Sequence, residues 1–250
     1  MANAKEVRTY QRLKTLLKKC ESIFYPNGYA CIECNKELND DERELSLCKD
    51  CLEKLPYRED SVCPICATYV STPGPCPRCR QVGMPFEKTY SLFDYVGIAR
   101  NIINNYKDNA RPWLHEYISK FLNPYALSLN LEVDLLVYVP SSPNAIKRRG
   151  YEHNELVAKS LACALKIPLI EPLARLRQKG DQTKLTYAER LRNVQKAFQL
   201  KDGFDSKIIK DKTILLYDDT MTTGATALSC ASILKKAGAK NIIVITFART

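Results

Sequence analysis

Four C-x2-C pairs restrict how this chain can fold more than any other feature of its sequence. A C-x2-C turn directs two thiolates at one ion, and two such turns complete a tetrahedral zinc site. Eight ligands therefore predict two structural zinc ions in one Cys-rich module. The spacing favours grouping of neighbouring pairs, while a cross-braced grouping of alternate pairs and ligation of an iron–sulfur cluster are the alternatives. The predicted ligands are Cys31, Cys34, Cys48, Cys51, Cys63, Cys66, Cys76 and Cys79.

The cellular surroundings decide between metal ligation and disulfide bonds for the 11 cysteines of this chain. The N-terminal segment has no apolar signal-peptide core, and no apolar run approaches the ~18 residues that a membrane span needs. We therefore expect a soluble, cytoplasmic protein without a transmembrane segment. A reducing cytosol keeps thiols unpaired, and this favours zinc over disulfides.

The formal net charge of +10 is unevenly distributed. Residues 31–79 hold 10 Asp and Glu against 6 Lys and Arg, and each zinc–tetrathiolate centre adds a formal charge of about −2. Such a negative module repels phosphates, so we expect a structural element or a protein-docking surface. Residues 141–200 hold 12 Lys and Arg against 5 Asp and Glu. This stretch predicts attraction of a phosphate-bearing ligand or a nucleic acid, with a solvated basic face as the alternative.

From residue 133 onward, short apolar strands alternate with segments of helical periodicity. This order predicts an α/β fold with a doubly wound, mostly parallel sheet, in which ligands bind at the carboxyl ends of the strands. The loops at those ends are residues 140–154 and 218–226. We expect strands at 133–139, 168–173, 212–217 and 241–247, and helices at 154–166, 186–194 and 225–237.

The same patterns predict three parts of the chain. Residues 1–30 are expected to form an N-terminal amphipathic helix and linker, because apolar side chains recur at helical spacing. Packing on the rest of the protein and lying on a membrane are the two alternative uses of that helix. The Cys-rich zinc module occupies residues 31–82, and the α/β domain occupies residues 83–250. The first elements expected in that domain are a strand at 88–97 and helices at 98–108 and 112–129.

The segment after Tyr217 predicts a phosphate site. A buried strand ends in Asp218 and Asp219, and a hydroxyl-rich turn with one glycine leads into a helix. Backbone N–H groups at a helix N-terminus bind anions, threonine hydroxyls add donors, and glycine lets the backbone approach closely. The alternative is that Asp219 or a threonine only caps the helix. The predicted phosphate-binding residues are Thr220, Thr222, Thr223, Gly224, Ala225 and Thr226.

This segment resembles the ribose-phosphate motif of type I phosphoribosyltransferases. The resemblance implies that Asp218 and Asp219 contact the ribose hydroxyls of 5-phosphoribosyl-1-pyrophosphate (PRPP), which these proteins bind with Mg²⁺. It also implies that the threonine loop binds the 5′-phosphate. These implications describe a phosphoribosyltransferase, a glycosyltransferase-class enzyme, with an acceptor that no motif identifies.

Further segments are similar to the ComF competence-protein family, which joins a zinc-binding Cys module to a phosphoribosyltransferase-like domain. They include Val139-Pro140, the run from Lys147 to Tyr151, and Ala197-Phe198. The family usually has Asn-Gln after the aromatic residue, where this chain has Glu152-His153. The resemblance implies a link to DNA uptake in natural transformation, with uptake proteins such as the competence helicase as candidate partners. The alternative function is a non-catalytic protein of competence that binds single-stranded DNA or acts as a scaffold.

Two other groups of polar residues are candidates for the same site. The basic run Lys147, Arg148 and Arg149 follows a strand, so we expect it at the pyrophosphate end of the ligand or against DNA; a solvated charge run is the alternative. The chain has 2 histidines, too few for a His-rich metal site. His153 is interpreted either as a general base or as an ordinary surface residue. Candidates for closing over the site are Gln182, Arg190 and Asn193, with an exposed helix as their alternative role.

Overall fold

The computed structural model describes residues 29–58, 61–109, 111–176 and 197–250. The chain divides into two compact units, one ending at Lys54 and the other beginning at Leu55. None of the helices in the described ranges is long and apolar enough to cross a bilayer. The amphipathic helix expected within residues 1–30 lies outside the described residues.

The first unit is built around a pair of cysteine turns. Its two short helices are α2 (Asp40–Arg43) and α3 (Lys49–Leu52), and the buried Leu38 and Leu47 form its small apolar interior. Asn39 caps α2 in a reciprocal capping box with Glu42, whose carboxylate accepts the Asn39 N–H at 3.0 Å. A unit with so few apolar residues depends on a metal centre for its stability.

The second unit contains a parallel sheet of five strands in the order β1-β7-β6-β2-β3. The central strand, β6, is buried from Ile214 to Tyr217 because helices cover both faces of the sheet. The prediction of a mostly parallel, doubly wound sheet is confirmed. The strands are β1 (Lys88–Asp94), β2 (Leu135–Tyr138), β3 (Leu169–Ile170), β6 (Thr213–Met221) and β7 (Asn241–Arg249).

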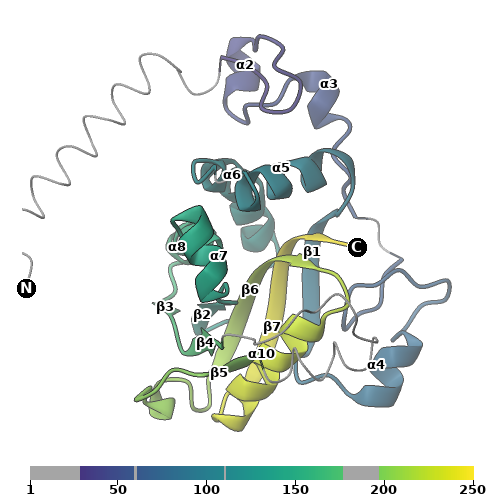
Figure 1. The fold of residues 1–250 in the computed structure, drawn as a ribbon. Helices are drawn as coiled ribbons and strands as arrows, with labels where there is room; N and C mark the ends of the chain where they lie inside the picture. Colours follow the sequence, from purple (N-terminus) through teal and green to yellow (C-terminus); the bar gives the residue numbers. More distant parts are fainter. Residues whose placement is uncertain (1–28, 59–60, 110, 177–196) are drawn as a thin grey trace, which may run out of the picture. The chain divides into compact units, whose positions relative to one another are not determined.

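Helices cover both faces of this sheet (Figure 1). One face carries α5, α6 and α8, and α10 packs on the other face against β6 and β7. The second cysteine group packs in the same apolar core as α10, so it is continuous with the sheet. The helices are α5 (Gly97–Lys107), α6 (Leu114–Ser128), α8 (His153–Leu165) and α10 (Ala225–Lys236).

The strand order reverses between β2 and β6. The chain passes from β2 outward to β3, and from β6 it continues to β7 on the opposite side. At such a switch point the carboxyl ends of two strands leave a crevice, which is the usual ligand site of open α/β sheets. The loops predicted to form the site follow these two strands.

The structure differs from the sequence-based expectation in two smaller segments. The expected loop 140–154 contains a helix, α7 (Pro143–Arg149), which Ser142 caps by accepting the Ala145 N–H at 3.2 Å. The segment expected as one strand at 168–173 instead gives β3 and β4, and β4 pairs antiparallel with β5. The remaining elements are α4 (Pro77–Val82), β4 (Leu173–Arg175), β5 (Phe198–Leu200) and the 3₁₀ turn η2 (Ser206–Ile208).

Candidate functional site

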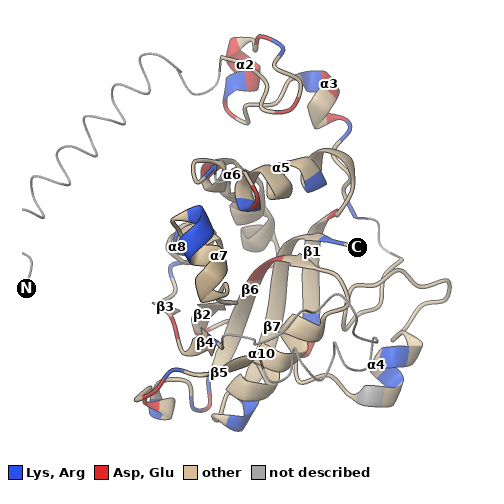
Figure 2. Cartoon of the chain, in the orientation of Figure 1, with Lys and Arg blue, Asp and Glu red and all other residues tan. Residues whose placement is uncertain are grey.

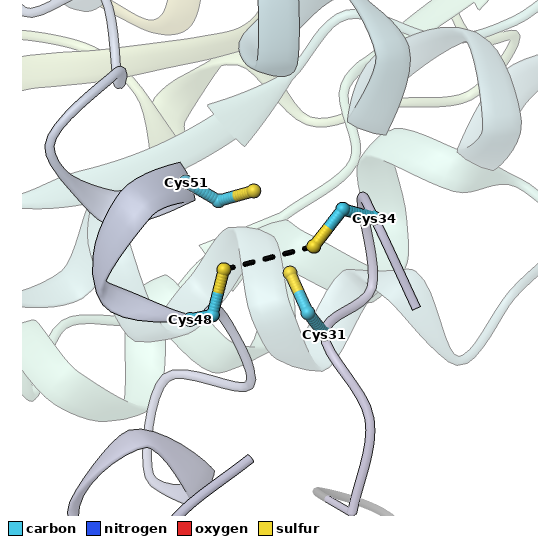
Figure 3. A group of neighbouring side chains, drawn as sticks. All are labelled: Cys31, Cys34, Cys48 and Cys51. Atoms are coloured by element: carbon cyan, nitrogen blue, oxygen red, sulfur yellow. Dashed lines mark hydrogen bonds between the residues drawn. The ribbon is translucent and has the colours of Figure 1, made fainter. Parts of the chain in front are cut away.

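Eight cysteine thiols form two separate groups of four. Within each group the Sγ atoms all lie within 4.8 Å of one another, as ligands of one tetrahedral ion do. Figure 3 shows the first group, in which four thiols point toward a common centre. The sequential grouping favoured by the spacing is therefore the one found. The first group is Cys31, Cys34, Cys48 and Cys51, and the second is Cys63, Cys66, Cys76 and Cys79.

The surroundings of both groups fit zinc. Seven of the eight thiols are buried, Cys34 being the exposed one, so their ligand atoms face one another more than water. The backbone N–H of Cys76 points at the Sγ of Cys63, 3.3 Å away, in the manner that stabilises a metal-bound thiolate. These residues would hold two structural Zn²⁺ ions, one in each unit of the chain.

Asp218 and Asp219, near the end of the central strand, have different environments. The pairing of β6 with β7 continues beyond them to Met221, so both lie within the strand and not in the expected loop. Asp219 is buried, with 2% of its surface exposed, whereas Asp218 is half-buried. Figure 2 shows these acidic residues at the end of β6. Asp218 is thus the one that remains accessible to a ligand.

Asp219 is held by a lysine and a histidine side chain from two helices. The Nζ of Lys107, the last residue of α5, lies 2.7 Å from Asp219 Oδ2. The Nε2 of His153, the first residue of α8, lies 2.9 Å from the same oxygen. Burial lowers the pKa of Lys107 and of His153, but the Asp219 carboxylate outweighs this effect and the net shift is upward for both. Asp219 is therefore an ionised centre that fixes the ends of two helices against the sheet.

The second ring nitrogen of His153, Nδ1, also lies close to polar side chains. Its Nδ1 lies 2.8 Å from Ser141 Oγ and 3.2 Å from Glu152 Oε1, and the Arg149 Nη1 approaches to 3.2 Å. Ser141 in turn donates its N–H and its hydroxyl to Glu152, each at 2.7 Å. The interpretation of His153 as a surface residue is wrong, because the residue is buried and only 5% of its surface is exposed.

Asp218 is oriented by a different set of donors. Its Oδ1 accepts the side-chain N–H of Asn154 and the backbone N–H of Asp219, both at 3.0 Å. Burial and the neighbouring Asp219 carboxylate raise the pKa of Asp218 to about 7, while Lys107 acts in the opposite direction. The carboxyl group of Asp218 consequently titrates near neutral pH.

The turn after β6 has the shape of an anion cradle. Gly224 adopts φ +72° as the N-cap of α10, and a Cβ at this position would lie 2.5 Å from the Met221 Cε. The first backbone bond of the helix runs from the Leu228 N–H to the Gly224 carbonyl at 2.9 Å, and the Ala225 N–H donates to Thr223 Oγ1 at 3.4 Å. The amides of residues 226 and 227 also belong to this first turn. Thr222 and Thr223 are exposed beside them. Glycine is needed here for both the backbone angle and the space.

The basic run lies on α7, near the end of β2. Lys147 and Arg148 are exposed, and Arg148 makes an exposed ion pair with Asp108 at 3.7 Å. Arg149 turns toward His153, and its buried Nε has no hydrogen-bond partner in the part of the chain that the structure describes. The other three predicted residues, Gln182, Arg190 and Asn193, lie outside the described residues.

Comparisons with known proteins agree with this two-part architecture. Residues 21–89 match the double zinc ribbon domain, and residues 145–250 match the phosphoribosyl transferase domain. DNA utilization protein YhgH of Salmonella typhimurium is 27% identical over 214 residues, which are 82% of this chain and 90% of that protein. Competence protein ComFC of Streptococcus pneumoniae is 28% identical over 245 residues, covering 96% of this chain and 97% of that protein. Competence protein F of Haemophilus influenzae is 23% identical over 233 residues, with coverages of 89% and 97%.

This combination of domains and relatives is consistent with the ComF family. The sequence had identified the family from its motifs, and the double zinc ribbon and the phosphoribosyltransferase domain are confirmed. It did not indicate Lys107 or Asn154 as parts of the site. The Glu152-His153 pair, which departs from the usual ComF motif, was the one local signal that pointed to the network around Asp219.

Proposed function

We propose that the end of β6, the following turn and α10 bind PRPP with Mg²⁺, and that the chain transfers the phosphoribosyl group to an acceptor. The observation that carries this proposal is the half-buried Asp218 beside a threonine-rich turn at the switch point of the sheet. A carboxylate next to an anion cradle suits a ligand with both hydroxyls and a phosphate, and a ribose phosphate has both.

Each part of the ligand has a matching group in the site. The amides at the start of α10 and the hydroxyls of Thr222, Thr223 and Thr226 would bind the 5′-phosphate. Asp218 would accept the ribose hydroxyls, or bind the Mg²⁺ that accompanies the pyrophosphate. Asp219 is already engaged with Lys107 and His153, so we assign it the role of positioning Asp218 and the two helices.

The basic end of α7 suits the pyrophosphate. In the transfer, the acceptor bonds to C1 of the ribose while the bond from C1 to the pyrophosphate oxygen breaks, and pyrophosphate leaves with the electron pair. The unpartnered Nε of Arg149 and the exposed charges of Lys147 and Arg148 would stabilise that leaving group.

Millimolar Mg²⁺–PRPP is expected to raise the melting temperature of the zinc-loaded chain. At a ligand concentration one hundred times Kd, the stabilisation is about 2.7 kcal/mol, or roughly 5–10 °C for a unit of this size. Asp218→Asn should remove most of the shift, because the amide neither binds Mg²⁺ nor accepts a ribose hydroxyl as strongly. Since Asp218 has a pKa of about 7, the native shift should grow between pH 6 and pH 8 as the carboxylate forms. Differential scanning fluorimetry measures all of these shifts.

The matched control for this experiment is Asp202→Asn, which changes an exposed aspartate outside the site. It should retain the full native shift. An absence of any shift in the native chain at millimolar Mg²⁺–PRPP would exclude the proposed ligand. A native-sized shift in Asp218→Asn would exclude the assigned role of Asp218.

A role in the use of external DNA is the biological context that the relatives suggest, since their names are DNA utilization and competence proteins. Direct binding of single-stranded DNA is the second candidate function. The exposed Lys147 and Arg148 at the end of α7 favour it, because adjacent exposed cations can contact successive phosphates. A scaffold role in competence, the other alternative, would not require Lys147 and Arg148 to contact DNA phosphates.

If DNA binds at α7, its affinity should fall steeply as the salt concentration rises. Replacing both Lys147 and Arg148 by alanine should reduce the magnitude of the slope of log K against log salt by about 1.4, since each single-strand phosphate contact contributes ~0.7. Fluorescence anisotropy with a labelled oligonucleotide between about 50 and 200 mM salt measures the slope. Lys207→Ala, at an exposed position on η2, is the control. Equal slopes for the native and doubly substituted chains would argue against DNA binding on α7.

A further inference from the structure

Residues 222–224 form the turn between β6 and α10, which we call the phosphate turn because we assign phosphate binding to it. Two arginines from outside β6 and α10 contact its backbone. Arg78 donates an Nη1 hydrogen bond to the carbonyl oxygen of Thr223. Arg249 donates from its Nη1 to the carbonyl oxygen of Thr222 at 3.2 Å. The two accepting carbonyls are consecutive, so the middle of the turn is held by two cationic side chains.

Both arginines are in turn fixed by the second cysteine group. Arg78 lies on α4 between the ligands Cys76 and Cys79, and Figure 2 shows this helix as a basic segment. Arg249 is buried, and its Nη2 lies 3.9 Å from the Sγ of Cys66. Zinc-bound thiolates carry negative charge and accept such hydrogen bonds. The zinc ribbon and the phosphate turn therefore contact the same two guanidinium groups.

We propose that the second zinc ribbon is part of the phosphate-binding site, with Arg78 and Arg249 as positioning residues that set the shape of the turn. In a planar trans peptide, the C=O of one residue and the N–H of the next point in opposite directions. Drawing the carbonyls of Thr222 and Thr223 toward the arginines turns the amides of Thr223 and Gly224 away from them. Those amides are then directed outward as anion donors.

This arrangement gives the second ribbon a task that the first ribbon does not share. The first group of cysteines belongs to the unit ending at Lys54, whereas the second group packs in the core with α10. Zinc at the second group fixes the cysteines on either side of Arg78 and so sets where its guanidinium lies. That the ligand is PRPP rests on the proposed function. The coupling between the second zinc ribbon and the phosphate turn does not depend on which ligand binds.

Hydrogen exchange in the turn tests the coupling without any ligand. In Arg78→Ala the amides of Ala225 and Leu228, which donate to Thr223 Oγ1 and to the Gly224 carbonyl, should exchange about tenfold faster than in the native chain, because a charged hydrogen bond that holds the turn is lost. Arg80→Ala is the matched control, since Arg80 lies on the same helix but donates to Pro75, at 2.7 Å. Its exchange in the turn should equal that of the native chain. Both variants keep all eight cysteines and should bind two zinc ions.

A titration with Mg²⁺–PRPP forms the second arm of the experiment. Arg78→Ala should raise Kd about tenfold, while Arg80→Ala leaves it unchanged. If native and Arg78→Ala chains exchange alike in the turn, or if Arg80→Ala matches Arg78→Ala, the coupling is overturned. If the native chain does not bind PRPP but the turn still loosens only in Arg78→Ala, the coupling stands and the proposed ligand fails.

Discussion

Replacing Cys63 by serine is expected to destabilise the unit formed by residues 55–250 strongly, whereas the same change at Cys31 leaves the stability of that unit unchanged. Both side chains are 1% exposed, and each begins the first C-x2-C pair of its group. The difference lies in what surrounds them. The second group packs in the core of the sheet, and the first belongs to the other unit. A structural zinc ion contributes about 10 kcal/mol or more, which is comparable to the whole stability of a domain.

The single tryptophan makes this comparison direct. Trp113 belongs to the unit from Leu55 onward, so its fluorescence reports the unfolding of that unit alone. We expect Cys63→Ser to lower the Trp-detected melting temperature by roughly 10 °C or more, and Cys31→Ser to leave it unchanged. Zinc content should fall from two ions to one in both variants. Equal melting temperatures for the two variants would show that the second ribbon does not stabilise the sheet.

The division between the two cysteine groups could not be predicted from their spacing. Four similar C-x2-C pairs look like one module, and spacing reports only which thiols can reach a common ion. The core to which a ribbon belongs is decided by apolar contacts, here those of Phe86 and of strands more than fifty residues further along the chain. The expected module boundaries, 31–82 and 83–250, remain a prediction, and the structure adds that the second group shares the core of the sheet.

Local patterns predicted most of the sheet and the turn that leads from β6 into α10, because each of these depends on neighbouring residues. Two boundaries of helices and strands were predicted wrongly, because the same local sequence pattern is compatible with more than one structure. Residues 140–154 were expected to form a loop, but Pro143, at the first position after the capping Ser142, begins a helix. The loop after the strand at 212–217 was expected to begin at Asp218, but pairing with β7 extends the strand past both aspartates.

No local signal marked Lys107 as a partner of Asp219. Lys107 precedes it by 112 residues and ends an ordinary amphipathic helix. Only the packing of α5 and α8 on the same face of the sheet brings Lys107 and His153 to one carboxylate. The sequence therefore indicated the strand on which we propose the site, and the fold shows that Asp219, of its two acids, is the one engaged by Lys107 and His153.

Lys107→Met is expected to destabilise the unit from Leu55 onward by about 3 kcal/mol, because it leaves part of the buried Asp219 charge uncompensated. The exposed fraction is 26% for the Lys107 side chain and 2% for that of Asp219, so water replaces little of the lost interaction. The matched control is Lys159→Met, which breaks an exposed pair with Glu155 on α8 and should cost no more than about 0.5 kcal/mol. Urea unfolding followed by Trp113 fluorescence measures both changes in free energy.

The pH dependence separates this electrostatic effect from a loss of packing. Burial raises the pKa of Asp219, but Lys107 and His153 outweigh it and hold the pKa below its ordinary range. The pair therefore contributes stability above the unfolded pKa of about 4 and loses it only as pH falls through the lower, folded value. Without Lys107 the pKa of Asp219 rises, so the carboxylate of the variant takes up a proton at a higher pH. Lys107 also lowers the pKa of Asp218 and of His153, so the stability difference between native and Lys107→Met should narrow as pH falls from about 9 through neutral and should narrow further below about pH 5. A difference that stays constant down to pH 4 would mean that Lys107 stabilises the unit through its aliphatic chain and not through its charge on Asp219.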